Sequence, residues 1–153
     1  MSSKKRIQFT TIINAPVAVV WRHVISPESY RHWAAAFSEG SHFEGSWAQG
    51  SGIRFLSPTG DGMVAEIAEN IAHERISIRH FGFIMNGVED TTSDAVKAWA
   101  PAFETYTFVA LREGTQMVVD QDVAAEWEQY ISEAWPKALA LLKALSESSA
   151  AET

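Results

Sequence analysis

The sequence predicts an α+β domain in which a curved antiparallel sheet wraps one long C-terminal helix. A stripe of apolar residues with helical spacing begins at Trp127 and continues to Leu145. Most of the chain before it consists of short alternating runs separated by glycine, as is typical of antiparallel strands. Because one long helix serves so many strands, we expect the sheet to curve around it and to leave a cavity. The stripe comprises Trp127, Ile131, Ala134, Trp135, Ala138, Leu141, Leu142 and Leu145.

The N-terminal part predicts one strand followed by two short helices. Residues 6–13 alternate between apolar and polar side chains, which indicates a half-buried strand. Pro16 then opens a helix, since proline is tolerated in a first helical turn. A second helix begins after Ser26, a residue type that caps helices, and we expect it to bury Tyr30 and Trp33.

Six further strands are expected between this helical pair and the C-terminal helix. Glycines divide residues 40–62 into two short strands, and two alternating runs and a hairpin follow. The strands are expected around 42–43, 53–56, 63–69, 75–83, 103–111 and 115–123. We predict a single domain over residues 1–153 with a core of about 6–145, and residues 146–153 are expected to fray because they are small and polar.

The connection over residues 84–102 is longer than loops usually are in compact domains. Ser93 has the pattern of a helix cap, and Pro101 is expected to stop the short helix that follows. Trp99 lies near the end of this helix. The segment is therefore either a flap that covers the core or a mobile lid over the cavity, with Trp99 as its inward anchor.

Several motifs together resemble those of a known superfamily over about residues 6–145. They are Ala15-Pro16, Val20-Trp21, Pro27 and Trp33 near the start, Gly62-Met63-Val64, Glu66-Ile67, Arg75-Ile76 and Gly114-Thr115 in the middle, and Trp135-Pro136-Lys137-Ala138-Leu139 with Leu142-Lys143 near the end. In order and spacing they resemble the SRPBCC superfamily, also called START-like or Bet-v-like. The final motif is similar to the branch named after homologues of the activator of the ninety-kilodalton heat-shock-protein ATPase.

The resemblance implies a helix-grip fold, with about seven strands, two short helices after the first strand and a long C-terminal helix held by the sheet. It also implies a range of functions. Most members bind hydrophobic small molecules or lipids, a few act on polyketides, and some bind chaperones. The branch has no common catalytic motif to carry over to this chain.

Composition limits the other classes of function. The chain has no cysteine, which excludes disulfides and thiolate chemistry, and its net charge of −7 argues against nucleic acid as a partner. No apolar run approaches the roughly 20 residues that span a bilayer, and no signal peptide is visible, so we expect a soluble, cytoplasmic protein without membrane insertion. Asp120 and Asp122 are expected to face water, and we predict no metal site and no cofactor.

Strand alternation predicts which side chains line the cavity. His80 and Gln121 fall on otherwise apolar strand faces. Each is either satisfied by a neighbour or a buried water, or it orients a ligand. Catalysis by His80 as a general base is less expected, since no orienting carboxylate is evident. The predicted ligand-binding residues are His80, Gln121, Trp99, Trp135, Tyr106, Phe108, Ile131 and Trp33.

The predicted function is binding of a small hydrophobic or aromatic ligand, lipid-like or polyketide-like, between the sheet and the C-terminal helix. One alternative is a chaperone-interacting protein, and a second is a polyketide cyclase-like enzyme; an enzyme is the less expected outcome. An open cavity with His80 exposed to it favours binding or catalysis, whereas an exposed patch over a filled cavity favours a chaperone partner. The oligomeric state is expected to be a monomer or a homodimer.

Overall fold

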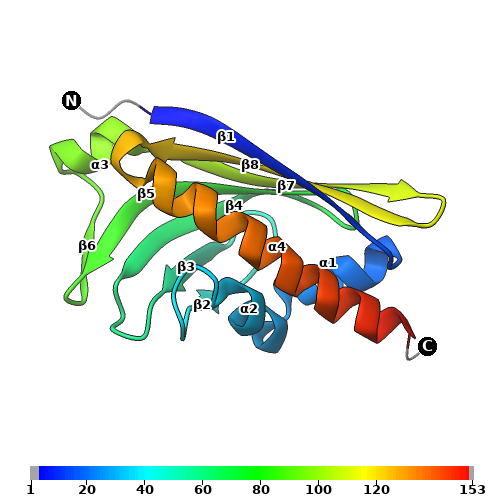
Figure 1. Cartoon of the computed structure of the whole chain (residues 1–153). Coiled ribbons are helices and arrows are strands. Elements are labelled where there is room, and N and C mark those ends of the chain that lie inside the picture. Colours follow the sequence, from blue (N-terminus) through cyan, green and yellow to red (C-terminus); the bar gives the residue numbers. More distant parts are fainter. Residues whose placement is uncertain (1–3, 152–153) are drawn as a thin grey trace.

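The computed structural model describes residues 4–151, which form one curved antiparallel sheet with a long helix lying across it (Figure 1). The strands are β1 Lys4–Ile13, β2 His42–Gly45, β3 Gly52–Leu56, β4 Gly62–Ile71, β5 Arg75–Met85, β6 Val88–Asp90, β7 Ala102–Leu111 and β8 Gly114–Ala124. The helices are α1 Val17–Ile25, α2 Pro27–Ala34, α3 Asp94–Trp99 and α4 Glu128–Ala151, and a 3₁₀ turn at Ala125–Trp127 leads into α4.

Within residues 4–151 the sheet has eight strands in the order β1-β8-β7-β5-β4-β3-β2, with β6 paired to β5 beside this path. All pairings are antiparallel. This arrangement confirms the predicted helix-grip α+β fold. The additional strand is β6, a three-residue segment inside the long connection, where no alternating run was visible.

The β3–β4 hairpin is closed so tightly that it requires a glycine. A β-carbon at Gly62 would lie 1.9 Å from the carbonyl oxygen of Phe55, which no other residue type could tolerate without a backbone shift. Gly62 is the first residue of β4, so this glycine belongs to the hairpin itself and not to the loop that precedes the strand. Its close approach holds the ends of β3 and β4 together beside the pocket described below.

Helix α4 buries one face against the sheet and against α1 and α2 (Figure 1). Ala134, Trp135, Ala138 and Leu142 from the predicted stripe are buried. The assignment of Trp127 to this stripe was wrong: the residue is 56% exposed, because the 3₁₀ turn places it before the first turn of α4.

We expected residues 146–153 to fray; residues 146–151 are helical, and residues 152–153 lie outside the described part of the chain. Ser146 is fully buried, and Glu147 accepts hydrogen bonds from the backbone N–H of Asn14 and from Lys143. These contacts attach the last turns of α4 to the segment that follows β1.

Candidate ligand pocket

A pocket of about 200 Å³ lies between α2, the first turns of α4 and the inner face of the sheet. Its wall is mainly aromatic and aliphatic, and one lining residue, Tyr130, is 45% exposed. The lining residues are Tyr30, Trp33, Ala34, Phe37, Ser41, Phe55, Leu56, Ser57, Asp61, Gly62, Met63, Glu104, Gln121, Tyr130, Ile131 and Trp135.

The aromatic wall is built around Trp33 from α2 and Trp135 from α4. Their rings stack with centroids 5.9 Å apart and planes inclined by 25°. Phe37 meets Trp135 edge-on at 5.0 Å, and Tyr30 meets Trp33 edge-on at 4.8 Å. Such edge-to-face and offset pairs are the favourable geometries for aromatic rings, so the wall is well packed without a ligand.

Two of the polar lining residues come from neighbouring strands. Glu104 on β7 and Gln121 on β8 are directly opposite each other in the antiparallel register, so their side chains stand together on the inner face. The indole Nε1–H of Trp135 donates to Gln121 Oε1 at 2.5 Å. This hydrogen bond fixes how the Gln121 amide faces the pocket.

Glu104 lies at the centre of a buried polar cluster. The hydroxyl of Tyr106 donates to Glu104 Oε2, and His80 Nε2 lies 3.1 Å from Glu104 Oε1. Within residues 4–151, His80 Nδ1 is buried with no hydrogen-bond partner. A neutral His80 ring is therefore best accommodated with its proton on Nε2, donating to Glu104, because the other tautomer would leave an N–H unpaired.

The two buried tyrosines of this region are held in their protonated form. Burial raises the pKa of Tyr106 well above its usual value, and the nearby charge of Glu104 raises it further. Burial and Glu104 also raise the pKa of Tyr30. Both hydroxyls therefore keep their protons at neutral pH, and Tyr106 serves as a permanent donor to Glu104.

Over residues 14–147 the sequence matches the family described as Activator of Hsp90 ATPase homolog 1-like protein. The chain belongs to this family. No curated protein matches it. The fold is one that commonly binds hydrophobic ligands.

Solved structures share the fold of this activator-homologue family at low sequence identity. An uncharacterized protein from Rhizobium leguminosarum is 18% identical with a TM-score of 0.73, covering 96% of this chain and 97% of that one. The Aha1 dimer from Colwellia psychrerythraea is 13% identical with a TM-score of 0.71, covering 94% and 96%. DynU16, from the dynemicin biosynthetic locus, is 19% identical with a TM-score of 0.64, covering 90% of this chain and 45% of that one.

In this family member, four of the eight predicted ligand-binding residues line the pocket: Trp33, Gln121, Ile131 and Trp135. The other four are not part of its lining. Tyr106 is buried with its ring edge-on to Trp135 at 5.8 Å, and Phe108 is buried edge-on to Trp21 at 5.2 Å. His80 is 1% exposed, between the rings of Phe55 and Trp99, and does not face the pocket.

Glu104 is the residue that sequence reasoning missed. The expectation that no carboxylate orients His80 was wrong, because Glu104 does so from the adjacent strand. The signal was present in the alternation of β7, where Glu104 shares the face of Tyr106 and Phe108. A carboxylate at the end of an apolar strand face is ordinarily assigned to solvent, and here the side chain is only 12% exposed.

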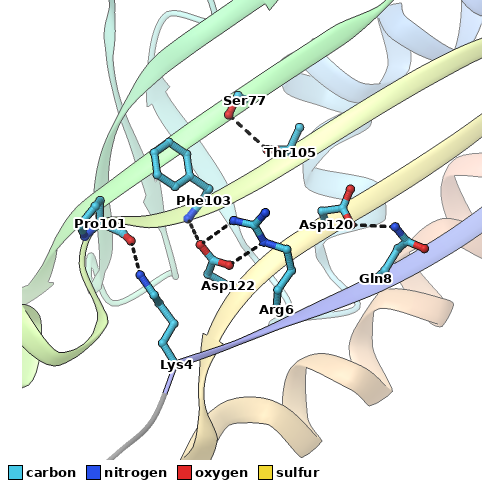
Figure 2. Close-up of polar contacts among 9 residues, drawn as sticks. All are labelled: Lys4, Arg6, Gln8, Ser77, Pro101, Phe103, Thr105, Asp120 and Asp122. Atoms are coloured by element: carbon cyan, nitrogen blue, oxygen red, sulfur yellow. Dashed lines mark hydrogen bonds and ion pairs between the residues drawn. The ribbon is translucent and has the colours of Figure 1, made fainter.

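The placement of Asp122 in water was also wrong (Figure 2). Asp122 is 6% exposed and accepts hydrogen bonds from Arg6 Nε at 2.9 Å and from the Phe103 backbone N–H at 3.0 Å. Asp120 is half-buried and accepts from Gln8 at 2.9 Å. Each carboxylate is thus tied to β1, and no cluster of three or more potential metal ligands occurs among the described residues.

Burial would raise the pKa of the Asp122 carboxyl, but hydrogen bonds from Arg6 and from the Phe103 N–H outweigh it. The net effect is a lowered pKa, so Asp122 is ionised at neutral pH. Its charge stabilises the junction of β1, β7 and β8 on the outer face of the sheet.

The long connection does not cover the pocket, since none of residues 84–102 lines it. Ser93 caps α3 by accepting from the Val96 N–H, as expected, and the helix ends at Trp99. Trp99 is 8% exposed and stacks on Phe83 with ring centroids 4.5 Å apart. The segment therefore covers a satellite of the core, and the interpretation of Trp99 as a lid anchor is not supported.

No helix within residues 4–151 combines the length and the apolar character needed to cross a bilayer.

Proposed function

We propose that this protein binds a small aromatic or hydrophobic molecule in the pocket between α2, α4 and the sheet. The observation that carries the proposal is the lining itself, in which an aromatic and aliphatic wall is combined with a few polar groups. Binding sites for small molecules commonly have this composition, because apolar walls supply affinity and placed polar groups supply orientation.

The volume narrows the class of ligand. An apolar cavity of roughly 150 Å³ accommodates benzene, whereas drug-sized ligands occupy roughly 300–1,000 Å³. A pocket of about 200 Å³ therefore suits a compound of one or two rings. A full-length lipid chain does not fit without an expansion of the pocket, so the aromatic ligand is favoured over the lipid-like one.

Native mass spectrometry of the purified protein tests for a retained small molecule, and ¹H–¹⁵N NMR titration with two-ring aromatic compounds tests binding directly. We expect shifts concentrated at the lining residues of α2 and α4. Ile131→Trp, which fills the pocket, is expected to abolish binding. Lys137→Trp is the matched control, because it adds the same side chain to an exposed position of α4. Absence of binding to the parent protein, or equal loss in both variants, contradicts the proposal.

A chaperone partner is the alternative supported by the family description. It is also supported by an exposed aromatic pair at the start of α4, where Trp127 and Tyr130 are 56% and 45% exposed and meet edge-on at 6.2 Å. Trp127→Ala would weaken such an interaction and leave the pocket unchanged. Pull-down with a purified ninety-kilodalton chaperone, comparing the parent with this variant, separates this alternative from small-molecule binding.

A polyketide cyclase-like enzyme is the second alternative. Glu104 presents a carboxylate to the pocket, as a general base would, and the fold is shared with DynU16 from a biosynthetic locus. Conversion of an added polyketide, followed by mass spectrometry and lost in Glu104→Gln, would favour this alternative over binding alone.

A further inference from the structure

We infer that the pocket selects aromatic ligands that carry a hydroxyl group, which Glu104 and Gln121 recognise together. This inference rests on the proposed function and adds the chemistry of the ligand. A hydroxyl group is both a donor and an acceptor. Glu104 and Gln121, side by side on strands β7 and β8, offer it one partner of each kind.

Gln121 supplies the donor. Its carbonyl oxygen already accepts from the Trp135 indole N–H, so its amide NH₂ is the end left for the pocket. Within residues 4–151 no other group accepts a hydrogen bond from this NH₂. The Trp135 contact also excludes the flipped amide, because that rotamer would set the NH₂ against the indole N–H. Gln121 therefore presents to the pocket a hydrogen-bond donor whose direction is fixed.

Glu104 supplies the acceptor. A carboxylate has about four lone-pair positions, and Tyr106 and His80 occupy one on each oxygen, so two remain. Both contacts come from buried side chains, and they hold the carboxylate in one orientation. The side chain is 12% exposed and lines the pocket, so a ligand that enters displaces the water that would otherwise use the remaining positions.

This arrangement penalises a ligand without a hydroxyl group. An aromatic hydrocarbon in the pocket would strip water from Glu104 and Gln121 and return no hydrogen bond. Removing water from the Gln121 NH₂ and from the two remaining acceptor positions of the Glu104 carboxylate, with no replacement, is costly. Sites built to hydrogen-bond a substrate hydroxyl reject analogues that lack it, whereas purely apolar pockets distinguish them poorly. The expected preference for the hydroxylated compound is about tenfold or more.

The test compares three two-ring probes by NMR titration of the whole protein: 2-naphthol, naphthalene and 2-methoxynaphthalene. We expect 2-naphthol to bind about tenfold or more tightly than naphthalene. The methoxy compound can accept from Gln121 but donates nothing to Glu104, so we expect it to bind more weakly than 2-naphthol. Equal affinity for 2-naphthol and naphthalene would overturn the inference and leave the proposed function standing. Binding of none of the three would contradict the proposed function itself.

A variant pair assigns the preference to Glu104. Glu104→Gln keeps the size of the side chain and removes its charge, and we expect the ratio of 2-naphthol to naphthalene affinity to fall to about threefold or less. Asp120→Asn makes the same chemical change on β8, next to Gln121 but on the opposite face, and is expected to keep the parent ratio. An unchanged ratio in Glu104→Gln, or tight binding of 2-methoxynaphthalene, would show that Glu104 is not the acceptor.

Discussion

Truncation of Trp135 to alanine is the sharpest test of how the pocket wall is built. The indole is 1% exposed and is in ring contact with Phe9, Trp33, Phe37 and Tyr106. Removal of a buried Trp or Phe side chain ordinarily costs about 3–5 kcal/mol. Because the adjoining pocket lets water reach the vacated space and Gln121, we expect a loss of about 4 kcal/mol rather than the upper limit.

For a chain of this length, a loss of that size lowers the melting temperature by about 8–16 °C. The assay is urea-induced unfolding followed by far-ultraviolet circular dichroism, because the substitution removes a fluorophore. An unchanged m-value would confirm that the comparison concerns the same folded and unfolded states. Trp135→Phe is the matched control, since it keeps a ring and removes the donor to Gln121; we expect it to cost about 1–2 kcal/mol. A loss below about 1 kcal/mol in Trp135→Ala would refute the packing argument, and equal losses in the two variants would show that the hydrogen bond outweighs the ring contacts.

Three further predictions concern regions outside the pocket. Asp122→Ala is expected to cost about 2–3 kcal/mol in urea unfolding, because it leaves the Phe103 N–H without its acceptor; Arg6→Ala should cost about 1 kcal/mol or less, since that side chain is 60% exposed. Burial lowers the pKa of His23 below 6.5. The imidazole of His23 therefore takes up a proton less readily in the folded protein than in the unfolded chain. The free energy of unfolding should therefore fall as the pH drops from about 6.5 toward the pKa of His23 in the folded state. His23→Gln should remove this part of the pH dependence, and identical profiles of unfolding free energy against pH for the parent and the variant would contradict the prediction. Trp99→Ala is expected to lower the free energy of unfolding by about 3 kcal/mol and to leave the affinity for 2-naphthol within about twofold. A loss of affinity without a loss of stability would instead support the interpretation of Trp99 as the anchor of a lid.

Most of the fold could be predicted because local pattern and tertiary structure agree. The hairpin of β7 and β8 and the stripe on α4 each bury one face, so their periodicities of two and 3.6 residues are visible in the sequence. The assignment of Trp127 to the buried stripe was wrong because an apolar residue next to a stripe cannot be distinguished from a member of it until the start of the helix is known. β6 is too short to show any periodicity.

The site was harder to predict because its position depends on which residues are removed from solvent by distant elements. Glu104 is a charged residue on a strand, and nothing local indicates that α2 and α4 enclose it. Asp122 was misplaced for a related reason: strand alternation identifies the outer face of the sheet, but Arg6 on β1 and the Phe103 N–H on β7 decide that this part of the face is shielded. Four of the predicted pocket residues were nevertheless found, since bulky side chains on inward faces meet wherever the long helix crosses the sheet.

The stacking of Trp33 on Trp135 also provides an optical probe within the binding site. Two indoles at 5.9 Å are close enough for their electronic transitions to couple, which gives a paired signal in circular dichroism that isolated tryptophans lack. One ring belongs to α2 and the other to α4, so any movement of these helices relative to each other when a ligand binds changes the coupling between the two indoles. Occupancy can therefore be followed in the unlabelled protein, and Trp33→Phe, which abolishes the coupling while retaining a ring, identifies the signal.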